Sequence, residues 1–449
     1  MIDHVDPAVP QTIRDELERL LNRYTKAISS GPLDMGRTNL VTHKIDTGGH
    51  PPIRQALRPT PHARRHEIDQ DVNEKLSLNI IEPACSPHAV NLVLVKKHDG
   101  TVRACCDYRA LNAVTKRDTY PLPRMDHCLD ALGGKNAWFS TLDLRSGYHQ
   151  VEMEPKDRDK TTFICHRGSF RFVTMPMGLM NAGATFQRLM DLVMSGLLYD
   201  TCLVYLDDII VFSPDLKEHL VRLERVLERL VTHGLKLKPS KCKLMQKRVS
   251  FLGHIVSGDG VEVDPEKTEA INSWDTPRSV KEVRSFLGLC SYYRRFVPGY
   301  AEIAAPMTAL QRKGVRFKWS DECQRAFEAL KQALVSPPML AMPFDVKQVD
   351  VEPAGQVGRY VLDTDASDHS IGAVLSQVQD DGTERVIAYA SRKLHPAEVN
   401  YCVTRRELLA IVEFTRKYRQ YLLEQPKFLI RTDHDALTWL KKSPEVVGQ

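Results

Sequence analysis

Two adjacent aspartates interrupt an apolar run in this 449-residue chain. The run is VYLDDIIVF over residues 204–212, so Asp207 and Asp208 stand between two strand-like segments. Burying two neighbouring carboxylates is costly unless a cation compensates for their charge. A tight hairpin would present both acids at its tip, where a metal ion favours their ionised forms. The pattern therefore predicts either a metal site or a surface turn that contains two acids.

A third carboxylate, Asp143, ends another apolar strand-like segment, FSTLD over residues 139–143. Three carboxylates on neighbouring strand ends are what a two-metal nucleotidyl transfer site requires. An all-oxygen site of this kind suits magnesium better than zinc or copper. The three acids together therefore predict phosphoryl transfer chemistry.

The composition limits the class of protein. Apolar residues make up 42% and charged residues 27% of the chain, as in ordinary globular domains, and the length allows two to four domains. No stretch approaches the ~18–20 uninterrupted apolar residues of a membrane span, and the first twenty residues do not resemble a signal peptide. The ten cysteines contain no CxxC pair, which argues against a zinc site and a disulfide framework.

Periodicity predicts a mixed fold. Apolar residues recur at helical spacing over 186–197 and 216–231, whereas 90–97 with 102–107 reads as a β-hairpin and 138–144 as a strand. Helices and strands mix without strict alternation, which favours an α+β class. Strand and helix signals over 360–432 predict a separate small α/β domain.

Basic residues gather in one part of the chain. Residues 231–300 hold 12 Lys and Arg against 7 Asp and Glu. Lys236, Lys238, Lys241 and Lys243 alternate along a strand-like stretch, and they either track a phosphate backbone or form a solvated face. Tyr292 and Tyr293 either stack on nucleic acid or pack inside, and we favour packing.

With these features in place, several blocks resemble the reverse transcriptases of gypsy-type LTR retrotransposon Pol polyproteins. YLDD over 205–208 is similar to their catalytic hairpin, and LDLRSGYHQ over 142–150 to their first catalytic motif. MPMGL over 175–179 and NAGATFQ over 181–187 resemble the motif and helix that support template and nucleotide. FLGH over 251–254 resembles the primer grip. The likeness spans roughly residues 40–449, although Met177 replaces the usual phenylalanine and Gly183 the usual proline.

The resemblance implies a role for each matching residue. Asp143, Asp207 and Asp208, with the main-chain carbonyl of Leu144, would hold two Mg²⁺ ions, with Mn²⁺ as a substitute. Tyr148 would exclude a 2′-hydroxyl, unless it is a core aromatic, and Met177 would lie against the nucleotide, unless it is a core methionine. The implied nucleotide contacts are Lys96 or Lys97, Arg103, Tyr148, Met177 and Gln187.

The C-terminal part carries its own acids. Asp365, Glu407 and Asp433 resemble the first three carboxylates of an RNase H-like active site, which would bind two metal ions and cut the RNA of an RNA–DNA hybrid. The family's fourth carboxylate has no counterpart before Gln449, so we expect a truncated domain.

These observations predict an architecture. We expect a right-hand polymerase with fingers, palm and thumb, then a connection and the truncated RNase H-like α/β domain. The expected boundaries are an N-terminal linker over 1–60, fingers, palm and primer grip over 61–256, thumb and connection over 257–345, and the RNase H-like domain over 346–449. Residues 345–359 read as an irregular polar insertion.

The expected function is RNA-directed DNA synthesis by a retrotransposon enzyme. Its implied partners are an RNA template, a DNA primer, RNA–DNA hybrid and dNTPs, with protease and integrase as other products of the polyprotein and no membrane. The resemblance also implies an intracellular setting, in a cytoplasmic particle or the nucleus. The alternative is a decayed or co-opted copy that binds nucleic acid without catalysis.

Overall fold

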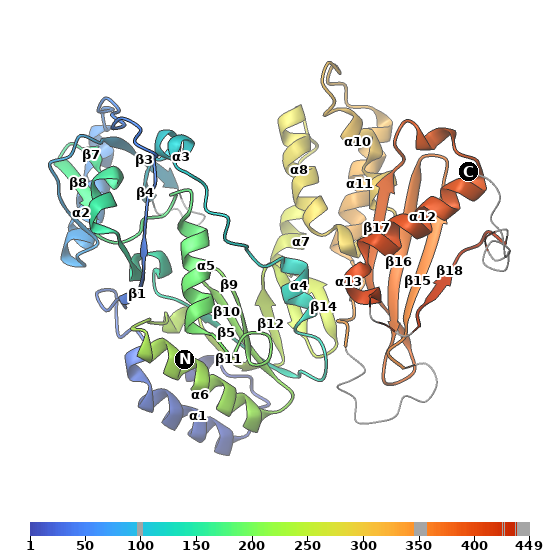
Figure 1. Cartoon of the computed structure of the whole chain (residues 1–449), viewed down its shortest axis with the longest axis horizontal. Helices are drawn as coiled ribbons and strands as arrows, with labels where there is room; N and C mark the ends of the chain where they lie inside the picture. Colours follow the sequence, from blue (N-terminus) through green and yellow to red (C-terminus); the bar gives the residue numbers. More distant parts are fainter. Residues whose placement is uncertain (97–101, 345–356, 424, 426, 436, 438–449) are drawn as a thin grey trace. The chain divides into compact units, whose positions relative to one another are not determined.

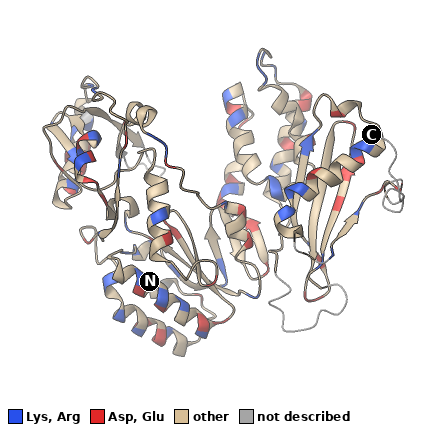
Figure 2. Ribbon diagram, in the orientation of Figure 1, with Lys and Arg blue, Asp and Glu red and all other residues tan. Residues whose placement is uncertain are grey.

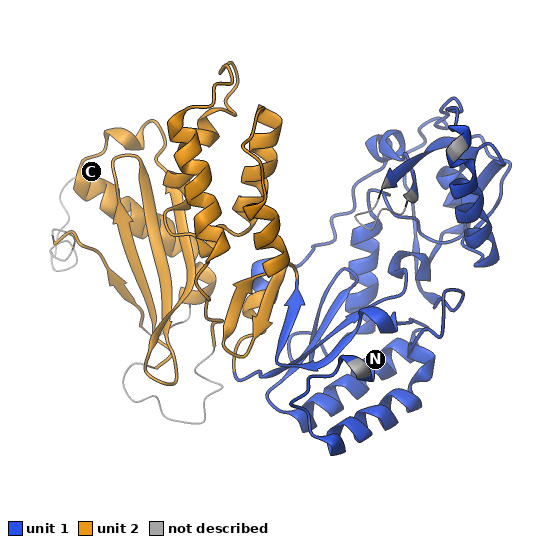
Figure 3. Ribbon diagram, turned by 180° about the vertical axis from the view of Figure 1, so that it is seen from behind, with its two compact units in different colours: residues 1–128, 135–251 blue, residues 129–134, 252–449 orange. Residues whose placement is uncertain are grey.

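The structure is a computed structural model that describes residues 1–449 apart from 97–101, 345–356, 424, 426, 436 and 438–449. The chain forms two compact units (Figure 3): unit 1 contains residues 1–128 and 135–251, and unit 2 contains residues 129–134 and 252–449. Most of the expected insertion at 345–359 therefore lies outside the described residues. Helices and sheets mix in both units, which confirms the α+β class. Among the described residues, no helix is both long and apolar enough to cross a bilayer.

Unit 1 contains two main sheets (Figure 1). A four-stranded antiparallel sheet has the order β11-β5-β10-β9, and a five-stranded sheet has the order β2-β8-β7-β3-β4. The strands of the two sheets are β2 (Ile81–Pro83), β3 (Val90–Lys96), β4 (Val102–Cys106), β5 (Trp138–Asp143), β7 (Phe163–Cys165), β8 (Gly168–Phe172), β9 (Cys202–Tyr205), β10 (Asp208–Ser213) and β11 (Lys243–Gln246). The expected hairpins at 90–107 and 202–212 are both present, as β3–β4 and β9–β10.

Helices and shorter strands complete unit 1. They are α1 (Gln11–Arg23), α2 (Arg65–Ser77), α3 (Arg109–Val114), α4 (Met125–Asp130), α5 (Ala182–Val193), α6 (Leu216–Thr232), β1 (Thr38–His43), β6 (Val151–Met153) and β12 (Arg248–Phe251); α4 runs across the boundary into unit 2. α5 and α6 pack against strands of the four-stranded sheet (Figure 1).

Local sequence explains α6. The Asp215 side chain accepts hydrogen bonds from the Lys217 and Glu218 N–H groups, which caps the helix N-terminus. Leu223, Leu227 and other apolar residues on one face are buried. Gly234 follows the helix with a left-handed φ of 68°, a conformation common just after a helix end.

The N-terminal residues, expected to form a linker, are folded into unit 1. Leu17 and Leu20 of α1 are buried, and α1 packs against α6. Val5 forms a β-bridge with Leu244 of β11. Apolar contacts with elements more than 200 residues away therefore order this polar, proline-rich segment.

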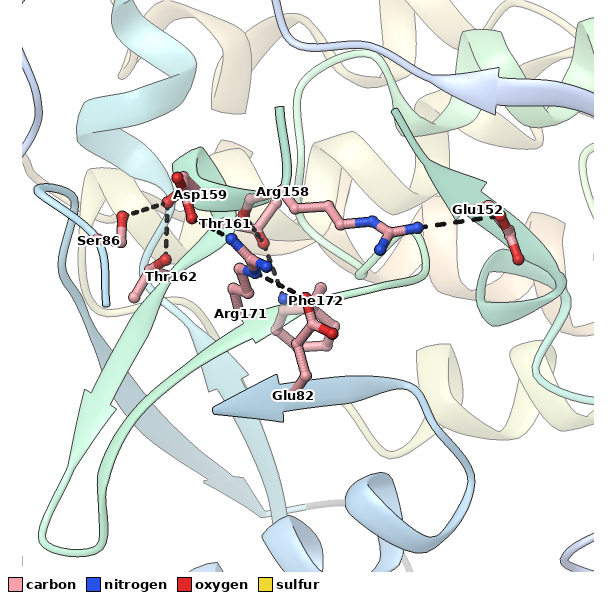
Figure 4. A network of polar contacts seen from close by, with 9 residues as sticks. All are labelled: Glu82, Ser86, Glu152, Arg158, Asp159, Thr161, Thr162, Arg171 and Phe172. Atoms are coloured by element: carbon pink, nitrogen blue, oxygen red, sulfur yellow. Dashed lines mark hydrogen bonds and ion pairs between the residues drawn. The ribbon is translucent and has the colours of Figure 1, made fainter. Parts of the chain in front are cut away.

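Charged side chains tie the five-stranded sheet to the turn at 155–161 (Figure 4). Arg171 of β8 donates to Glu82 of β2 and to Asp159, each over 2.7 Å. The Ser86 and Thr162 hydroxyls donate to the Asp159 carbonyl. The network therefore joins β2 and β8 to this turn.

Unit 2 contains a helical part and a second sheet. The helical part has a β13–β14 hairpin and five helices: β13 (His254–Ser257), β14 (Gly260–Val263), α7 (Pro265–Asn272), α8 (Val280–Tyr292), α9 (Tyr300–Ile303), α10 (Ala305–Ala309) and α11 (Asp321–Val335). The sheet has the order β17-β16-β15-β18, with β15 (Tyr360–Ala366), β16 (Ser370–Val378), β17 (Glu384–Lys393), β18 (Leu429–Arg431) and the helices α12 (Val403–Lys417) and α13 (Arg419–Leu422). α12 packs on β15 and β16, with Ala410 and Phe414 buried.

A six-residue segment, 129–134, joins unit 2 although its sequence neighbours lie in unit 1. Asp130 accepts hydrogen bonds from Arg295 Nη2 over 3.2 Å and from the Tyr421 hydroxyl over 2.5 Å. These half-buried polar contacts anchor the segment, and no local pattern at 129–134 predicts them.

Candidate active sites

The β9–β10 hairpin presents the paired aspartates. Tyr205 and Asp208 face each other in the ladder, so Leu206 and Asp207 form a two-residue turn. Val204 and Ile209 on either side are buried, which fixes the hairpin in the core. Leu206 adopts a left-handed φ of 56°, a conformation that is unfavourable for residues other than glycine. The expected hairpin tip with two acids is therefore present.

Asp143 joins these two acids from the neighbouring strand. It is the last residue of β5 and lies opposite Asp208 in the antiparallel register. Asp143, Asp207 and Asp208, here called the Asp143 cluster, thus share one end of the sheet. Leu144 follows directly, is buried, and forms a β-bridge with Leu237.

Asp208 lies where both burial and neighbouring carboxylates disfavour its charge. Desolvation raises the pKa of Asp208 to about 6, and the charges of Asp207 and Asp143 add to the shift. Lys241 Nζ lies 3.1 Å from Asp143 Oδ2 and partly offsets the repulsion. A carboxylate group that is short of positive charge is the environment that a divalent cation stabilises. The donor set therefore fits a divalent cation.

Tyr148 lies beside this cluster. Ser146 has a left-handed φ of 47° and leads into a short 3₁₀ turn over Gly147–Gln150. The Tyr148 ring packs edge-on against Phe186 of α5, with 5.1 Å between centroids. Burial raises the pKa of Tyr148, and the Asp207 carboxylate adds to the rise. The ring is therefore half-buried, held by α5 and electrostatically coupled to the cluster.

Met177 and Gln187 occupy different environments. Met177 is 42% exposed and lines a cavity of about 340 Å³ with Arg145, Ser146 and residues of α2 and β4. Gln187 is only 1% exposed, and its amide hydrogen-bonds the main chain of the β9–β10 hairpin. The sequence motif did not reveal this supporting contact, and the expected substrate contact of Gln187 stays a prediction.

The expected triphosphate ligands lie on β3 and β4 or between them. Val95 pairs with Arg103 and Lys96 with Val102. The side chains of Lys96 and Arg103, and all of Lys97, lie outside the described parts of the chain. Their predicted contacts with nucleotide therefore stay predictions.

The basic segment makes several internal contacts. Lys236 forms an ion pair with Asp34, and Lys241 with Asp143. Tyr293 is buried and donates to the Gly253 carbonyl over 2.9 Å, while Tyr292 donates to the Leu252 carbonyl over 2.7 Å. Both tyrosines thus pack against the 252–254 turn. Elsewhere opposite charges are mixed, as on α1 and α6 (Figure 2).

A second acidic site lies in unit 2. Ligand oxygens of Asp365, Glu407 and Asp433, here called the Asp365 cluster, lie within 4.8 Å of one another. Parallel pairing of β15 with β18 brings Asp365 and Asp433 to the same sheet end, and α12 supplies Glu407. Among the described residues, the Asp365 cluster alone reaches this spacing, so the Asp143 cluster is more open.

Glu407 is the buried member of the Asp365 cluster, at 3% exposure. Its Oε1 accepts a hydrogen bond from the Ala366 N–H over 3.2 Å, whereas its buried Oε2 has no hydrogen-bond partner among the described residues. Burial raises the pKa of Glu407, and the charge of Asp433 adds to the rise. An unpartnered buried carboxylate oxygen beside two further acids fits a divalent cation.

Two parts of the chain match known families. Residues 95–256 match the family "Reverse transcriptase (RNA-dependent DNA polymerase)", and residues 358–448 match "RNase H-like domain found in reverse transcriptase". The first match contains the Asp143 cluster and the second the Asp365 cluster.

Curated relatives are transposon polyproteins. The chain is 40% identical over 436 residues to the Retrovirus-related Pol polyprotein from transposon 297 of Drosophila melanogaster, covering 96% of this chain and 40% of the relative. It is 34% identical over 387 residues to the Transposon Tf2-3 polyprotein of Schizosaccharomyces pombe, covering 86% of this chain and 28% of the relative. The chain thus spans two fifths or less of the length of these two relatives.

Solved structures share the fold. A foamy viral protease-reverse transcriptase dRH in complex with ds DNA matches with a TM-score of 0.84 and 23% identity, over 99% of this chain and 75% of that one. The same viral enzyme in complex with RNA/DNA hybrid matches with a TM-score of 0.80, over 99% of this chain and 58% of that one. The chain therefore belongs to the reverse transcriptases of gypsy-type retrotransposon Pol polyproteins, with the RNase H-like domain of that family after the reverse transcriptase domain.

Proposed function

We propose that this chain is an RNA-directed DNA polymerase that extends a DNA primer with dNTPs on an RNA or DNA template by two-metal nucleotidyl transfer. The observation that carries the proposal is the register of β5 and β10, which sets Asp143 opposite Asp208 with Asp207 in the adjoining turn. Support for the nucleic-acid partners comes from the related viral enzyme, whose structures contain ds DNA and RNA/DNA hybrid.

Asp143, Asp207, Asp208 and the Leu144 carbonyl would hold two Mg²⁺ ions, for which Mn²⁺ can substitute. When bound, these ions would supply activation of the primer 3′ oxygen and neutralisation of the triphosphate. The protein's part is to hold its carboxylates at the sheet end, and the buried residues next to them in β5, β9 and β10 provide this rigidity.

Residues around the cluster would select and orient the nucleotide. Tyr148 is braced by Phe186 at the edge of the cluster, where its ring would exclude a 2′-hydroxyl. Met177 would contact the nucleotide from the cavity that it lines. Lys96 or Lys97 and Arg103 would bind the triphosphate, a task suited to long cationic side chains.

We assign a second activity, cleavage of RNA in RNA–DNA hybrids, to the Asp365 cluster. Asp365, Glu407 and Asp433 would hold the divalent cations, supported by their close spacing and by the unpartnered Glu407 oxygen. We further assign 61–256 to fingers, palm and primer grip, 257–345 to thumb and connection, and 346–449 to the RNase H-like domain. As in the family, protease and integrase would be separate products of the same polyprotein.

Primer extension tests the polymerase assignment. The wild-type chain, Asp207→Asn and a matched control, Asp200→Asn, are compared on an RNA template with dNTPs and Mg²⁺. Asp200 is exposed in the turn before β9, outside the Asp143 cluster. We expect templated extension by wild type and control, and none by Asp207→Asn. A wild type that binds hybrid but extends nothing across metals and templates would instead support a decayed or co-opted copy.

A further inference from the structure

Helix α5 carries a buried amide that holds the aspartate hairpin. Gln187 Oε1 accepts a hydrogen bond from the Leu206 N–H over 2.8 Å. Gln187 Nε2 donates to the Val204 carbonyl over 3.2 Å and to Asp191 Oδ1 over 2.9 Å. One side chain, 1% exposed, therefore binds the main chain at the turn and in the strand that leads to it.

Asp191 reinforces the orientation of this amide, which the Leu206 N–H and the Val204 carbonyl also select. An ionised carboxylate only accepts hydrogen bonds, so the Gln187 NH₂ group must point to Asp191 and the carbonyl oxygen is left for Leu206. Leu206 is the residue with the left-handed φ of 56° in the turn. Such a conformation persists only where its surroundings hold it, and the Gln187 acceptor contacts the turn at this residue.

Asp191 is itself held by the loop that precedes α4. The Tyr120 hydroxyl donates to Asp191 Oδ2 over 2.6 Å. The Arg188 guanidinium lies 4.6 Å above the Tyr120 ring and donates to Asp118 Oδ2 over 2.7 Å. The Tyr120 N–H donates to Asp118 Oδ1 over 2.9 Å, which fixes the loop to the same carboxylate.

We propose that Asp191 and Tyr120 are positioning residues of the polymerase site, which act through Gln187 to fix the turn that carries Asp207 and Asp208. The proposal rests on the proposed polymerase function. The five side chains Asp118, Tyr120, Gln187, Arg188 and Asp191, here called the Gln187 brace, join α5 and the 118–120 loop to the hairpin main chain. None of the five belongs to the Asp143 cluster, and Asp191 and Tyr120 act on the geometry of the hairpin through Gln187.

Hydrogen exchange tests the brace without any need for catalysis. Wild type, Asp191→Asn, Tyr120→Phe and the control Asp200→Asn are compared without divalent cations. An asparagine at 191 can also donate, so it no longer reinforces the orientation of the Gln187 amide, and Tyr120→Phe removes only a hydroxyl. We expect faster exchange of the Leu206 amide in Asp191→Asn, a smaller increase in Tyr120→Phe and no change in the control. Wild-type exchange at Leu206 in Asp191→Asn would overturn the brace.

Steady-state kinetics then tests its consequence. We expect Asp191→Asn to lower kcat about tenfold and raise the Mg²⁺ concentration for half-maximal rate, with KM for dNTP within about twofold, because a misplaced ligand set weakens the transition state more than nucleotide binding. In a Gln187→Met background, Asp191→Asn should have no further effect, since Asp191 acts through Gln187. An unchanged kcat, or the same loss in both backgrounds, would overturn the positioning role. A wild type that extends no primer would refute the proposed function. Hydrogen exchange of the Leu206 amide would then be the only test of whether the Gln187 brace holds the turn.

Discussion

Asp143 and Asp208 are direct partners in the antiparallel β5–β10 ladder. Side chains of such partners lie on the same face of a sheet, and like charges in this position repel. The raised pKa of Asp208, about 6, reflects desolvation first and then the neighbouring Asp207 and Asp143 charges. The strand register that would bind cations therefore also destabilises the cation-free protein.

The first prediction concerns this repulsion. Asp208→Asn should abolish primer extension and yet raise the melting temperature of the metal-free protein by about 1–3 °C. A carboxyl whose pKa is raised in the folded state destabilises the fold at pH values above that pKa. The gain in melting temperature of Asp208→Asn over wild type should therefore be full at about pH 7.5 and should fade as the pH falls through 6 towards 4. Thermal melts in EDTA at both ends of this range measure it. A variant that melts below wild type at about pH 7.5 would contradict the prediction.

Local patterns in the sequence predicted much of this site. The apolar run with two central acids predicted the β9–β10 hairpin, and helical spacing predicted α5 and α6, because these signals lie within about twenty residues of one another. The order of the strands, with β5 beside β10, is a tertiary pairing across more than sixty residues. The family resemblance predicted that Asp143, Asp207 and Asp208 lie together in one site, whereas composition and periodicity alone did not.

Contacts between distant residues account for the features that local sequence patterns do not predict. Tyr120 reaches Asp191 across 71 positions, and both read as unremarkable polar or aromatic residues in the sequence. The linker expectation for 1–60 had the same origin, because α1, whose Leu17 and Leu20 are buried, packs against the distant helix α6. A polar or proline-rich composition describes a segment, but it does not show which distant surface will cover it.

The second prediction concerns the Tyr148 ring. A Cβ at Gly147 would lie 2.9 Å from Phe186 Cζ, so Gly147→Ala must displace a fully buried ring that packs against Tyr148. We expect the ratio of kcat/KM for dNTP to that for rNTP to fall about tenfold. Single-nucleotide insertion with dGTP and GTP measures it. Unchanged selectivity would mean that Tyr148 is positioned by other contacts.

Gly183→Ala is the matched glycine control. A Cβ at Gly183 would meet Leu206 Cδ2 at 3.6 Å, an ordinary van der Waals contact. Gly183 lies in the first turn of α5, where alanine restricts the unfolded chain more than glycine does. We expect this variant to keep wild-type nucleotide selectivity and to gain about 0.5–1 kcal/mol in the free energy of unfolding.

The third prediction concerns His219 of α6, which bridges two strands of the site. Its Nε2 and Nδ1 lie 2.7 Å from the hydroxyls of Ser140 in β5 and Ser213 in β10. Burial lowers the pKa of His219 from 6.5 to about 3, so the unfolded chain binds a proton that the folded chain excludes. Stability should therefore fall as pH drops from about 6.5 towards 3.

His219→Gln should flatten this pH dependence, because glutamine does not titrate, while it lowers stability at neutral pH through poorer packing. Urea unfolding at a series of pH values measures both effects. The exposed His50 provides the control, since His50→Gln should leave the profile unchanged. If the free energy of unfolding of His219→Gln fell as steeply with decreasing pH as that of wild type, the pH dependence would belong to other groups.

The last prediction concerns the edge strand β18, which carries Asp433 just beyond its end. The Arg431 guanidinium grips Asp363 of β15 in a bidentate pair, with Nε–Oδ1 at 2.5 Å and Nη2–Oδ2 at 2.8 Å. Both side chains are at least a third exposed, so the pair adds little stability, but it fixes β18 on β15 two residues before Asp433 and Asp365.

Arg431→Gln should therefore weaken Mn²⁺ binding at the Asp365 cluster about threefold to tenfold, through a looser Asp433, and change the melting temperature little. Calorimetric titration in an Asp208→Asn background measures it, because that background weakens cation binding at the Asp143 cluster. Arg431→Lys keeps the charge but cannot form the bidentate pair, so its Mn²⁺ affinity should lie between those of the parent and Arg431→Gln. Asp365→Asn in the same background should remove the binding, which shows that the titrated site is the correct one. Equal affinity in Arg431→Gln and its parent would mean that β15 and α12 position the cluster without help from β18.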